Sequence, residues 1–450
     1  MSAQPLQQIA EMLLDAAKRH GATAADVVVA EGDALEAGVR LGEIEKLKQA
    51  RQKHLGLRVF INERSAITSS ADFAGEALER LAEDTCALAR VIAPDPFSGL
   101  PDATDLARTI PDMDLYDPEI AAVTAEHAIA TAQEAEQAAL AADARVTNSE
   151  GASFGSSTGR VVYASTLGFL GEYRDSNVSL AVVPVASDNG SMQRDYWYSV
   201  QRKLARLEGA ADIGRRAAER AVRRLGARRA QTCEVPVIFD PETASSLLHH
   251  LAGAVSGYAL YKGTSFLIGK LGQRIAPEWV TIIDDGTVAG GLGSKPFDGE
   301  GLATRRTAVV DHGALVSYLF DTYSAKKLNS RSTGNATRSV AEAPHVAPMN
   351  FVLQPGTASP EEIIRSVQRG LYVTELIGFG VNPVTGDYSR GAVGQWIENG
   401  EFAYPVEEIT IAGNLLKMYE AIEVIGNDLE FRHTVVAPTV KIARMTVAGS

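Results

Sequence analysis

Apolar segments that end in Gly, Asn or Asp turns impose the strongest constraint on how this chain can fold. In its second half, Asp285-Gly286, His312-Gly313 and Asn399-Gly400 each follow such a segment, which is typical of β-hairpins. The first half mixes similar segments with stretches of helical periodicity. We therefore predict an α+β protein. A mixed N-terminal α/β domain with helices on a sheet should precede a largely antiparallel β domain with a few helices, for which a barrel is one arrangement.

Two hydrophobic cores are expected, because 450 residues exceed the roughly 100–200 residues of an ordinary domain. The sequence changes character near residue 229, where segments rich in helix give way to hairpins. We predict an N-terminal α+β domain over residues 1–228 and a C-terminal β-rich domain over residues 229–450. Within the first, residues 93–118 are rich in proline and aspartate and predict an irregular connector.

Helical spacing of apolar residues recurs four times in the N-terminal domain. It predicts helices over residues 6–20, 73–92, 119–142 and 209–225. The segments between them alternate and are bounded by turn residues, as strands are. They predict strands at 26–30, 34–41, 55–61, 64–69, 146–153, 160–165, 169–174 and 178–186, with a hairpin at Asp188-Asn189-Gly190. The set implies a mixed layer in which helices cover one face of a sheet.

The C-terminal domain should begin with a buried strand and a well-marked helix. The apolar run Val235–Phe239 is followed by Asp240, a good N-cap, and by Pro241, which suits the first helical position. We expect this helix to reach Val255. Two further helices are expected among the hairpins, over residues 360–369 and 412–424.

The charge distribution argues against a nucleic-acid partner or an anionic membrane partner. The formal net charge is −13, and no block of Lys and Arg stands alone. The densest basic stretch, Arg215–Arg229, is interleaved with Ala and Leu. We interpret it as a solvated helix face in preference to an anion site.

Cysteine usage indicates a reducing compartment. Cys86 and Cys233 are the only cysteines, and they are far apart and lack CxxC spacing. Disulfide frameworks, thiolate zinc sites and redox pairs are therefore not expected. No apolar window reaches the roughly 18 residues that a membrane-spanning helix needs. We expect a cytoplasmic protein.

Two glycine-rich segments resemble catalytic motifs only superficially. Gly151–Gly155 matches G-x-S-x-G, but a nucleophile elbow needs a helix directly after the serine, and another strand is predicted here. We expect a glycine-rich hairpin instead. Gly290–Lys295 lacks the spacing of a phosphate-binding loop and the helix that follows one. We expect an ordinary loop.

His249-His250 is the most conspicuous candidate for a metal site. Adjacent residues on a helix point about 100° apart, so both cannot bind one ion. Gly253 and Ala254, one turn further on, cannot act as ligands. We expect one histidine to be exposed and the other packed. A site assembled from distant histidines remains open, but no pattern in the sequence supports one.

Several segments, taken in order, resemble the PmbA/TldE branch of the TldD/PmbA peptidase family along almost the whole chain. Their order and spacing carry the resemblance, because no single one is as diagnostic as a metal signature. They are residues 249–257, 261–266, 295–301, 323–328, 332–335, 386–391, 411–415 and 426–429.

The resemblance implies that this chain has no zinc site of its own. The catalytic branch carries H-E-x-x-x-H on the matching helix and a late cysteine. Alignment on Gly263-Thr264-Ser265 places Leu248 and Gly253 at the two histidines and His249 at the glutamate, and no cysteine follows Cys233. No cofactor is therefore expected in this chain. The family implies a heterodimer in which a TldD-like partner supplies the zinc.

The family also implies a function for such a subunit, which is to complete the channel of a peptidase for unfolded peptides. Members trim peptide-antibiotic precursors and an antitoxin. Polar residues in two of the similar regions are our candidates for contacts with the peptide channel or the partner. They are Tyr323, Ser332, Thr333, Gly334, Asn335, Arg338, Tyr388, Ser389, Arg390 and Gly391.

These candidate residues allow more than one interpretation. Each of them can equally serve loop structure or dimer packing. A non-enzymatic peptide-binding or adaptor protein, as a homodimer, is the alternative from another class. An unsuspected metalloenzyme would carry stoichiometric metal in the purified chain.

Overall fold

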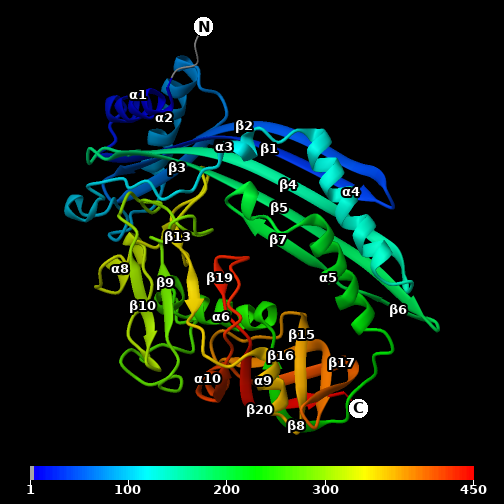
Figure 1. The fold of residues 1–450 in the computed structure, drawn as a ribbon. Helices are drawn as coiled ribbons and strands as arrows, with labels where there is room; N and C mark the ends of the chain where they lie inside the picture. Colours follow the sequence, from blue (N-terminus) through cyan, green and yellow to red (C-terminus); the bar gives the residue numbers. More distant parts are fainter. Residues whose placement is uncertain (1–4, 450) are drawn as a thin grey trace.

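A computed structural model describes residues 5–449 of the chain. A large curved sheet in the N-terminal half arches over a C-terminal half that is built from shorter strands (Figure 1). Helices and extensive antiparallel sheets occur in both halves, so the predicted α+β class is confirmed. The boundary between residues 228 and 229 stays a prediction. No helix within residues 5–449 is long and apolar enough to span a membrane.

The N-terminal sheet has seven antiparallel strands in the order β3-β2-β1-β4-β5-β6, and β7 also pairs with β5. Its strands are β1 (Ala24–Arg40), β2 (Glu43–Ile61), β3 (Arg64–Ser70), β4 (Val146–Ser165), β5 (Leu170–Asp188), β6 (Ser191–Arg194) and β7 (Trp197–Gln201). The predicted hairpin at Asp188-Asn189-Gly190 joins β5 to β6 and is confirmed.

Four of these strands are much longer than predicted. β2 begins at Glu43 rather than at residue 55, and in β1, β4 and β5 the glycine and polar residues between the predicted segments form strand rather than turn. Gly32 of β1 lies opposite Gly159 of β4. A Cβ at Gly32 would stand 2.7 Å from the carbonyl oxygen of Thr158, so the close pairing requires glycine. The hairpin expected at Gly151–Gly155 is therefore wrong, since these residues lie inside β4. No helix follows Ser153 directly, as expected.

Four helices cover one face of the sheet, as predicted. Successive side chains of a strand point to opposite faces. Ala25, Val27 and Val29 of β1 pack under α1 and α2, and further along the strand Leu35 and Ala37 pack under α4 and α5. The helices of this half are α1 (Leu6–Arg19), α2 (Gly75–Val91), α3 (Pro118–Ala121), α4 (Ala125–Ala142) and α5 (Ala210–Arg223), with single turns η1 (Ala103–Asp105) and η2 (Leu204–Arg206).

One predicted helix is interrupted. The helix expected over residues 119–142 is divided between α3 and α4, because Thr124 is extended and caps α4 by accepting a hydrogen bond from His127 N at 3.3 Å. The proline-rich connector before it contains only the single turn η1 between α2 and α3.

A closed five-stranded barrel forms the core of the C-terminal half. The order β17-β16-β15-β8-β20 closes through pairing of β20 with β17, and β18 adds to β20. A second sheet has the order β11-β10-β9-β14-β19, and β12 pairs with β13. The strands are β8 (Cys233–Phe239), β9 (Ile282–Asp285), β10 (Arg306–Asp311), β11 (Ala314–Leu315), β12 (Ala336–Thr337), β13 (His345–Val346), β14 (Phe351–Leu353), β15 (Arg369–Ile377), β16 (Asp387–Glu398), β17 (Glu401–Asn414), β18 (Ile422–Ile425), β19 (Val435–Val436) and β20 (Val440–Ala448).

The predicted helices of this half agree with the structure mainly at their first residues. They are α6 (Pro241–Ala254), α7 (Gly257–Tyr261), α8 (Thr322–Lys327), α9 (Pro360–Arg365) and α10 (Leu415–Glu420). The predicted helix over residues 412–424 is wrong at both ends, because β17 runs to Asn414 and β18 begins at Ile422. The helix expected to reach residue 369 ends at Arg365.

Two of the three hairpin turns predicted for this half are confirmed. His312-Gly313 and Asn399-Gly400 join adjacent antiparallel strands, and all four residues have positive φ. Asp285-Gly286 does not close a hairpin, because residues 286–305 separate β9 from β10. Two pairs are parallel, β8 with β15 and β14 with β19, so the half is largely but not wholly antiparallel.

A buried charge cluster joins the N-terminal sheet to the C-terminal half. Asp26 of β1 accepts a hydrogen bond from Arg58 Nε of β2 at 3.0 Å and another from Arg338 Nη1 at 2.6 Å. Glu300 Oε1 lies 3.6 Å from Arg58 Nη2. None of these four side chains is more than 9% exposed. Burial alone would raise the pKa of Asp26, but the two arginines outweigh it and the pKa lies below its ordinary value.

We predict that Asp26→Ala lowers the free energy of unfolding by about 3–5 kcal/mol, because it leaves two buried arginines with a single carboxylate. Urea denaturation measures the change. Asp33→Ala is the matched control on the same strand, since Asp33 is 64% exposed and lies 3.7 Å from Arg51. That variant should stay within about 0.5 kcal/mol of wild type. Equal effects of the two substitutions would contradict the role given to the cluster.

Candidate functional site

Helix α6 positions the side chains around which a site can be built, because it leaves the barrel directly after β8. Asp240 caps its first turn, and Oδ1 accepts hydrogen bonds from Thr243 N at 2.9 Å and Thr243 Oγ1 at 2.8 Å. One face of α6 packs leucines into the barrel core. Another contacts the N-terminal half, where Tyr198 donates a hydrogen bond of 2.7 Å to Glu242.

The positions on α6 that the family resemblance equates with a zinc site do not form a zinc donor set. Leu248 is buried in the barrel core. His249 is exposed, and its Nδ1 lies 2.8 Å from the carbonyl oxygen of Ser245. Gly253 offers no side chain. Zinc sites in proteins use three or four nitrogen, sulfur or oxygen donors, so these residues do not fit the metal. Elsewhere in residues 5–449, no three His, Cys, Asp or Glu side chains are grouped to hold a metal ion.

His250 differs from its exposed neighbour. It is half-buried, and its ring meets that of Tyr388 edge-on at a centroid distance of 6.2 Å. Burial, with the nearby Arg390 as a second cause, lowers the pKa of His250 to about 4, so the imidazole is neutral at pH 7. Its Nε2 has no hydrogen-bond partner among the described residues.

Four of the predicted site residues lie on β16 beside α6. Arg390 Nη1 donates to Ser246 Oγ at 3.1 Å, and its Nη2 donates to the carbonyl of Leu376 at 3.3 Å. Tyr388 is buried, and its hydroxyl has no partner within residues 5–449. Ser389 is exposed, whereas Gly391 is half-buried in the middle of the strand. This group therefore combines an exposed serine with buried polar atoms that have no partner within residues 5–449.

The other six predicted residues lie against different elements and are held mostly by internal contacts. Tyr323 donates a 2.6 Å hydrogen bond to Asp95 at the edge of a cavity of about 560 Å³. Ser332 Oγ donates to Phe320 O at 3.1 Å, and Thr333 Oγ1 donates to Asn335 Oδ1 at 2.6 Å. Gly334 has a positive φ, and Asn335 Nδ2 donates to Asp284 Oδ2 at 2.6 Å. Arg338 pairs with Asp26, as described above. A role of either group in a peptide channel stays a prediction.

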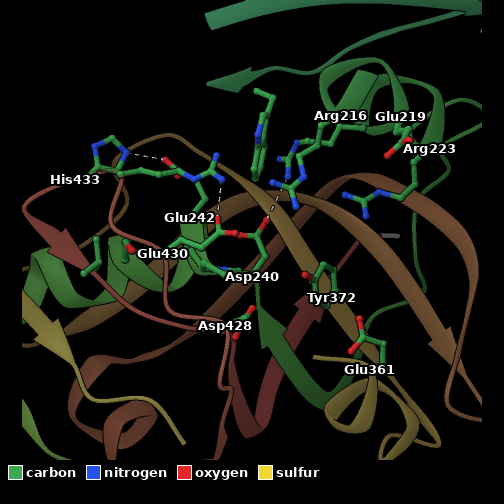
Figure 2. A pocket seen from close by; sticks show the side chains of 16 residues that line it. Arg216, Glu219, Arg223, Asp240, Glu242, Glu361, Tyr372, Asp428, Glu430 and His433 are labelled. Carbon is green, nitrogen blue, oxygen red and sulfur yellow. Dashed lines mark hydrogen bonds and ion pairs between the residues drawn. The ribbon is translucent and has the colours of Figure 1, made fainter. Parts of the chain in front are cut away.

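A cavity of about 480 Å³ lies between α5 and the amino end of α6 (Figure 2). It combines side chains from both halves of the chain, so neither half forms it alone. The lining residues are Trp197, Arg216, Glu219, Arg220, Arg223, Asp240, Pro241, Glu242, Ser245, Glu361, Tyr372, Asp428, Glu430, Arg432, His433 and Val436. None of them is among the residues predicted from the sequence.

Ion pairs fix the walls of this cavity. Arg220 Nε lies 3.2 Å from Asp195 Oδ1, and its Nη1 lies 3.7 Å from Asp240 Oδ2. Arg432 Nη2 lies 2.8 Å from Glu430 Oε2, and the guanidinium stacks on Trp197 at 3.7 Å from the ring centroid. Such paired and stacked arginines are held in one geometry. The walls of the cavity are therefore held by contacts within the chain itself.

Two acidic side chains at the start of α6 have pKa values shifted in opposite directions. Burial raises the pKa of Asp240 to about 6, although Arg220 and the hydrogen bonds from Thr243 oppose the shift. Burial would also raise the pKa of Glu242, but His433 and Tyr198 outweigh it and the pKa lies below its ordinary value. Asp240 is thus partly protonated near pH 6, while Glu242 remains ionised.

The chemistry of the lining suits binding better than covalent catalysis. Ser245 is the one serine among the lining residues. Its hydroxyl donates to the carbonyl of Pro241 at 2.7 Å and accepts from Ala437 N at 3.1 Å. Neither of these partners is a base, which an activated nucleophile requires. Charged and aromatic groups for holding a polar ligand are present instead.

The interpretation of the basic stretch Arg215–Arg229 as a solvated helix face holds for the exposed Arg215 and Arg229, but not for the half-buried arginines of α5 that line the cavity. Arg216, Arg220 and Arg223 recur at spacings of four and three, so they share one face of the helix. That face lines the cavity. The spacing is visible in the sequence, but the residues that contact this face, Trp197 of the N-terminal half and Asp240 of the C-terminal half, are brought to it only by the fold.

Family models cover nearly the whole chain. Residues 25–89 match the PmbA/TldA metallopeptidase domain 1, residues 118–225 match the central domain, and residues 232–449 match the C-terminal domain.

Individual relatives match over most or all of their length. Metalloprotease PmbA of Escherichia coli O157:H7 is 39% identical over 94% of this chain and 92% of its own length. A Bacteroides thetaiotaomicron protein, described as a candidate modulator of DNA gyrase, has a structure with a TM-score of 0.93 at 27% identity, covering 100% of both chains. TldE from Thermococcus kodakarensis shares the fold, with a TM-score of 0.89 at 23% identity over 98% of this chain and 100% of its own.

The pKa of Asp240 predicts a pH dependence of stability. Its ordinary value is 3.8 and its value in the folded chain is about 6. Between these values the folded chain holds a proton that the unfolded chain has released, so stability falls as the pH rises. Asp240→Asn keeps an equally good N-cap without the titration. From pH 4 to pH 7, wild type should lose roughly 2–3 kcal/mol more unfolding free energy than this variant.

Urea denaturation at the two pH values provides the measurement. Asp188, exposed at the end of β5, provides the control, because Asp188→Asn should leave the pH dependence of wild type intact. If wild type and Asp240→Asn lose the same free energy over this range, the assigned environment of Asp240 is incorrect.

Proposed function

This chain belongs to the PmbA/TldE branch of the PmbA/TldD metallopeptidase family, and from this premise we propose that it is the subunit without zinc in a two-chain peptidase. The partner is a TldD-like chain that holds the zinc and performs the hydrolysis. The proposal rests on three residues of α6. At the positions that the family resemblance equates with the two histidine ligands and the glutamate base, this chain has the buried Leu248, Gly253 and the exposed His249.

The proposed substrates are unfolded peptides, such as peptide-antibiotic precursors or an antitoxin. An extended chain can pair with exposed strand edges through its backbone, which makes binding tolerant of sequence. A second subunit can wall a channel that admits only such chains. Free Cys86 and Cys233 suit a reducing compartment such as the cytoplasm.

We propose that residues of β16 and the neighbouring His250 of α6 form part of that channel wall. His250 Nε2, Tyr388 Oη and Arg390 Nε are buried and lack hydrogen-bond partners within residues 5–449. Unpaired buried polar atoms are costly. Backbone groups of a bound peptide or of the partner would supply the missing contacts, so we assign Tyr388 and Arg390 to channel or partner contacts.

Reconstitution tests the proposed division of labour. The chain alone should not cleave an unfolded peptide, whereas a mixture with the TldD-like chain should, and the two should co-elute as a heterodimer. Mass spectrometry of the products measures cleavage. If the mixture stays inert while this chain alone still binds the peptide, the alternative of a non-enzymatic peptide-binding protein, as a homodimer or adaptor, replaces the proposal.

Arg390→Gln should lower kcat/KM of the mixture by roughly 10–100-fold, which corresponds to the loss of a charge-assisted hydrogen bond of about 1.5–3 kcal/mol. Initial rates on an unfolded peptide measure the effect. Arg229→Gln is the control, because Arg229 is exposed and pairs with Glu408 at the surface. Unchanged activity in Arg390→Gln with an intact heterodimer would remove Arg390 from the channel.

A further inference from the structure

Arg223 is the one arginine of the cavity in Figure 2 that has no counter-ion within residues 5–449. Its Nε is buried without a hydrogen-bond partner, and it takes part in none of the ion pairs that fix its neighbours Arg220 and Arg224. Figure 2 shows its guanidinium pointing into the cavity without a dashed line. Arg223 is therefore a cation in the cavity wall that no carboxylate within residues 5–449 pairs directly.

The surroundings make this charge unfavourable in the free protein. Burial lowers the pKa of Arg223, and the positive charge of Arg220 adds to the effect. Taking a cation out of water without an anion costs free energy that a bound anion restores. A guanidinium also offers two parallel N–H donors, which match the two oxygens of a carboxylate.

The lining carries six acidic side chains against four arginines, so it disfavours an anion with more than one charge. Of its four arginines, three are already neutralised. Arg216 lies 3.8 Å from Glu208, and Arg220 and Arg432 form the pairs described above. Glu219, Glu361 and Asp428 also line the cavity, so a phosphate with two charges would meet further negative charge. A ligand that carries both a carboxylate and a positively charged group suits the unpaired Arg223 and the acidic part of the lining together.

We propose that this cavity binds the C-terminal carboxylate of a short peptide, with Arg223 as the bidentate donor and the Tyr372 hydroxyl beside it. The volume of about 480 Å³ falls within the roughly 300–1,000 Å³ of small-ligand sites. The ammonium end of the same peptide faces the carboxylates of Glu361 and Asp428, which lie across the cavity from Arg223 (Figure 2). The choice of a peptide among carboxylate ligands rests on the proposed function, and the site would hold a substrate end or a cleavage product.

Calorimetry on the full chain without a partner tests the site. The probe is Ala-Ala-Ala with a free carboxylate, and the comparison is the same tripeptide with a C-terminal amide. We expect the acid to bind at least tenfold more tightly than the amide, and Arg223→Gln to weaken binding of the acid by at least tenfold. Arg223→Lys should give an intermediate affinity, because it keeps the charge but loses the paired donors.

Matched controls separate binding from folding. Arg215→Gln alters an exposed arginine of the same helix that lies outside the cavity lining and pairs with Asp212, so it should bind like wild type. Arg223→Gln should melt no lower than wild type, because it breaks no ion pair. If it fails to fold, the comparison of acid with amide and the Arg223→Lys variant still decide the question.

Equal binding of acid and amide, unchanged binding by Arg223→Gln, or no binding of the tripeptide would overturn the proposal. Inorganic phosphate that displaces the tripeptide at an equal or lower concentration would also overturn it, in favour of a phosphate site. The assay needs neither the TldD-like chain nor cleavage. Its failure is therefore distinguishable from failure of the proposed peptidase function.

Discussion

The salt bridges of Asp26 are the contact on which the relation between the two halves depends. The carboxylate lies on β1 of the N-terminal sheet, and it pairs with Arg58 of β2 and with Arg338 from the C-terminal half. The backbones of the two halves are also in close contact at this junction, since a Cβ at Gly56 would overlap the carbonyl oxygen of Val340. Buried charges of this kind need all their partners in place. Each half therefore requires the other for its charges to be compensated.

That junction lies near one end of the N-terminal sheet, and a second junction forms where α5 meets the start of α6 and β15. Arg220 reaches Asp240, and Arg224 Nη1 lies 2.6 Å from Glu375 Oε2. The cavity of Figure 2 forms between these elements. It has a fixed shape because its walls are ion-paired. Arg223 takes no part in these pairs, in which Arg220 and Arg224 contact Asp195, Asp240 and Glu375.

The sequence was most informative where local chemistry decides the structure. Asp240 followed by Pro241 marked the start of α6, and Asn399-Gly400 marked a hairpin, because capping and left-handed turns depend on a few adjacent residues. It was least informative where tertiary pairing decides. Gly32 and Gly159 looked like turn residues until each was placed opposite the other. The cavity was missed for the same reason, since its acidic and basic walls come from distant segments.

The proposed peptidase divides its work between a chain that holds the zinc and this chain, which completes the assembly. Leu248 and Gly253 are the reason for giving this chain the part without zinc, because a leucine side chain cannot ligate a metal and glycine has no side chain. Native mass spectrometry of the reconstituted complex, with zinc counted for the complex and for each separated chain, tests this most directly. We predict one zinc for each one-to-one heterodimer, retained by the TldD-like chain and absent from this one. Stoichiometric zinc in this chain purified alone would contradict that division.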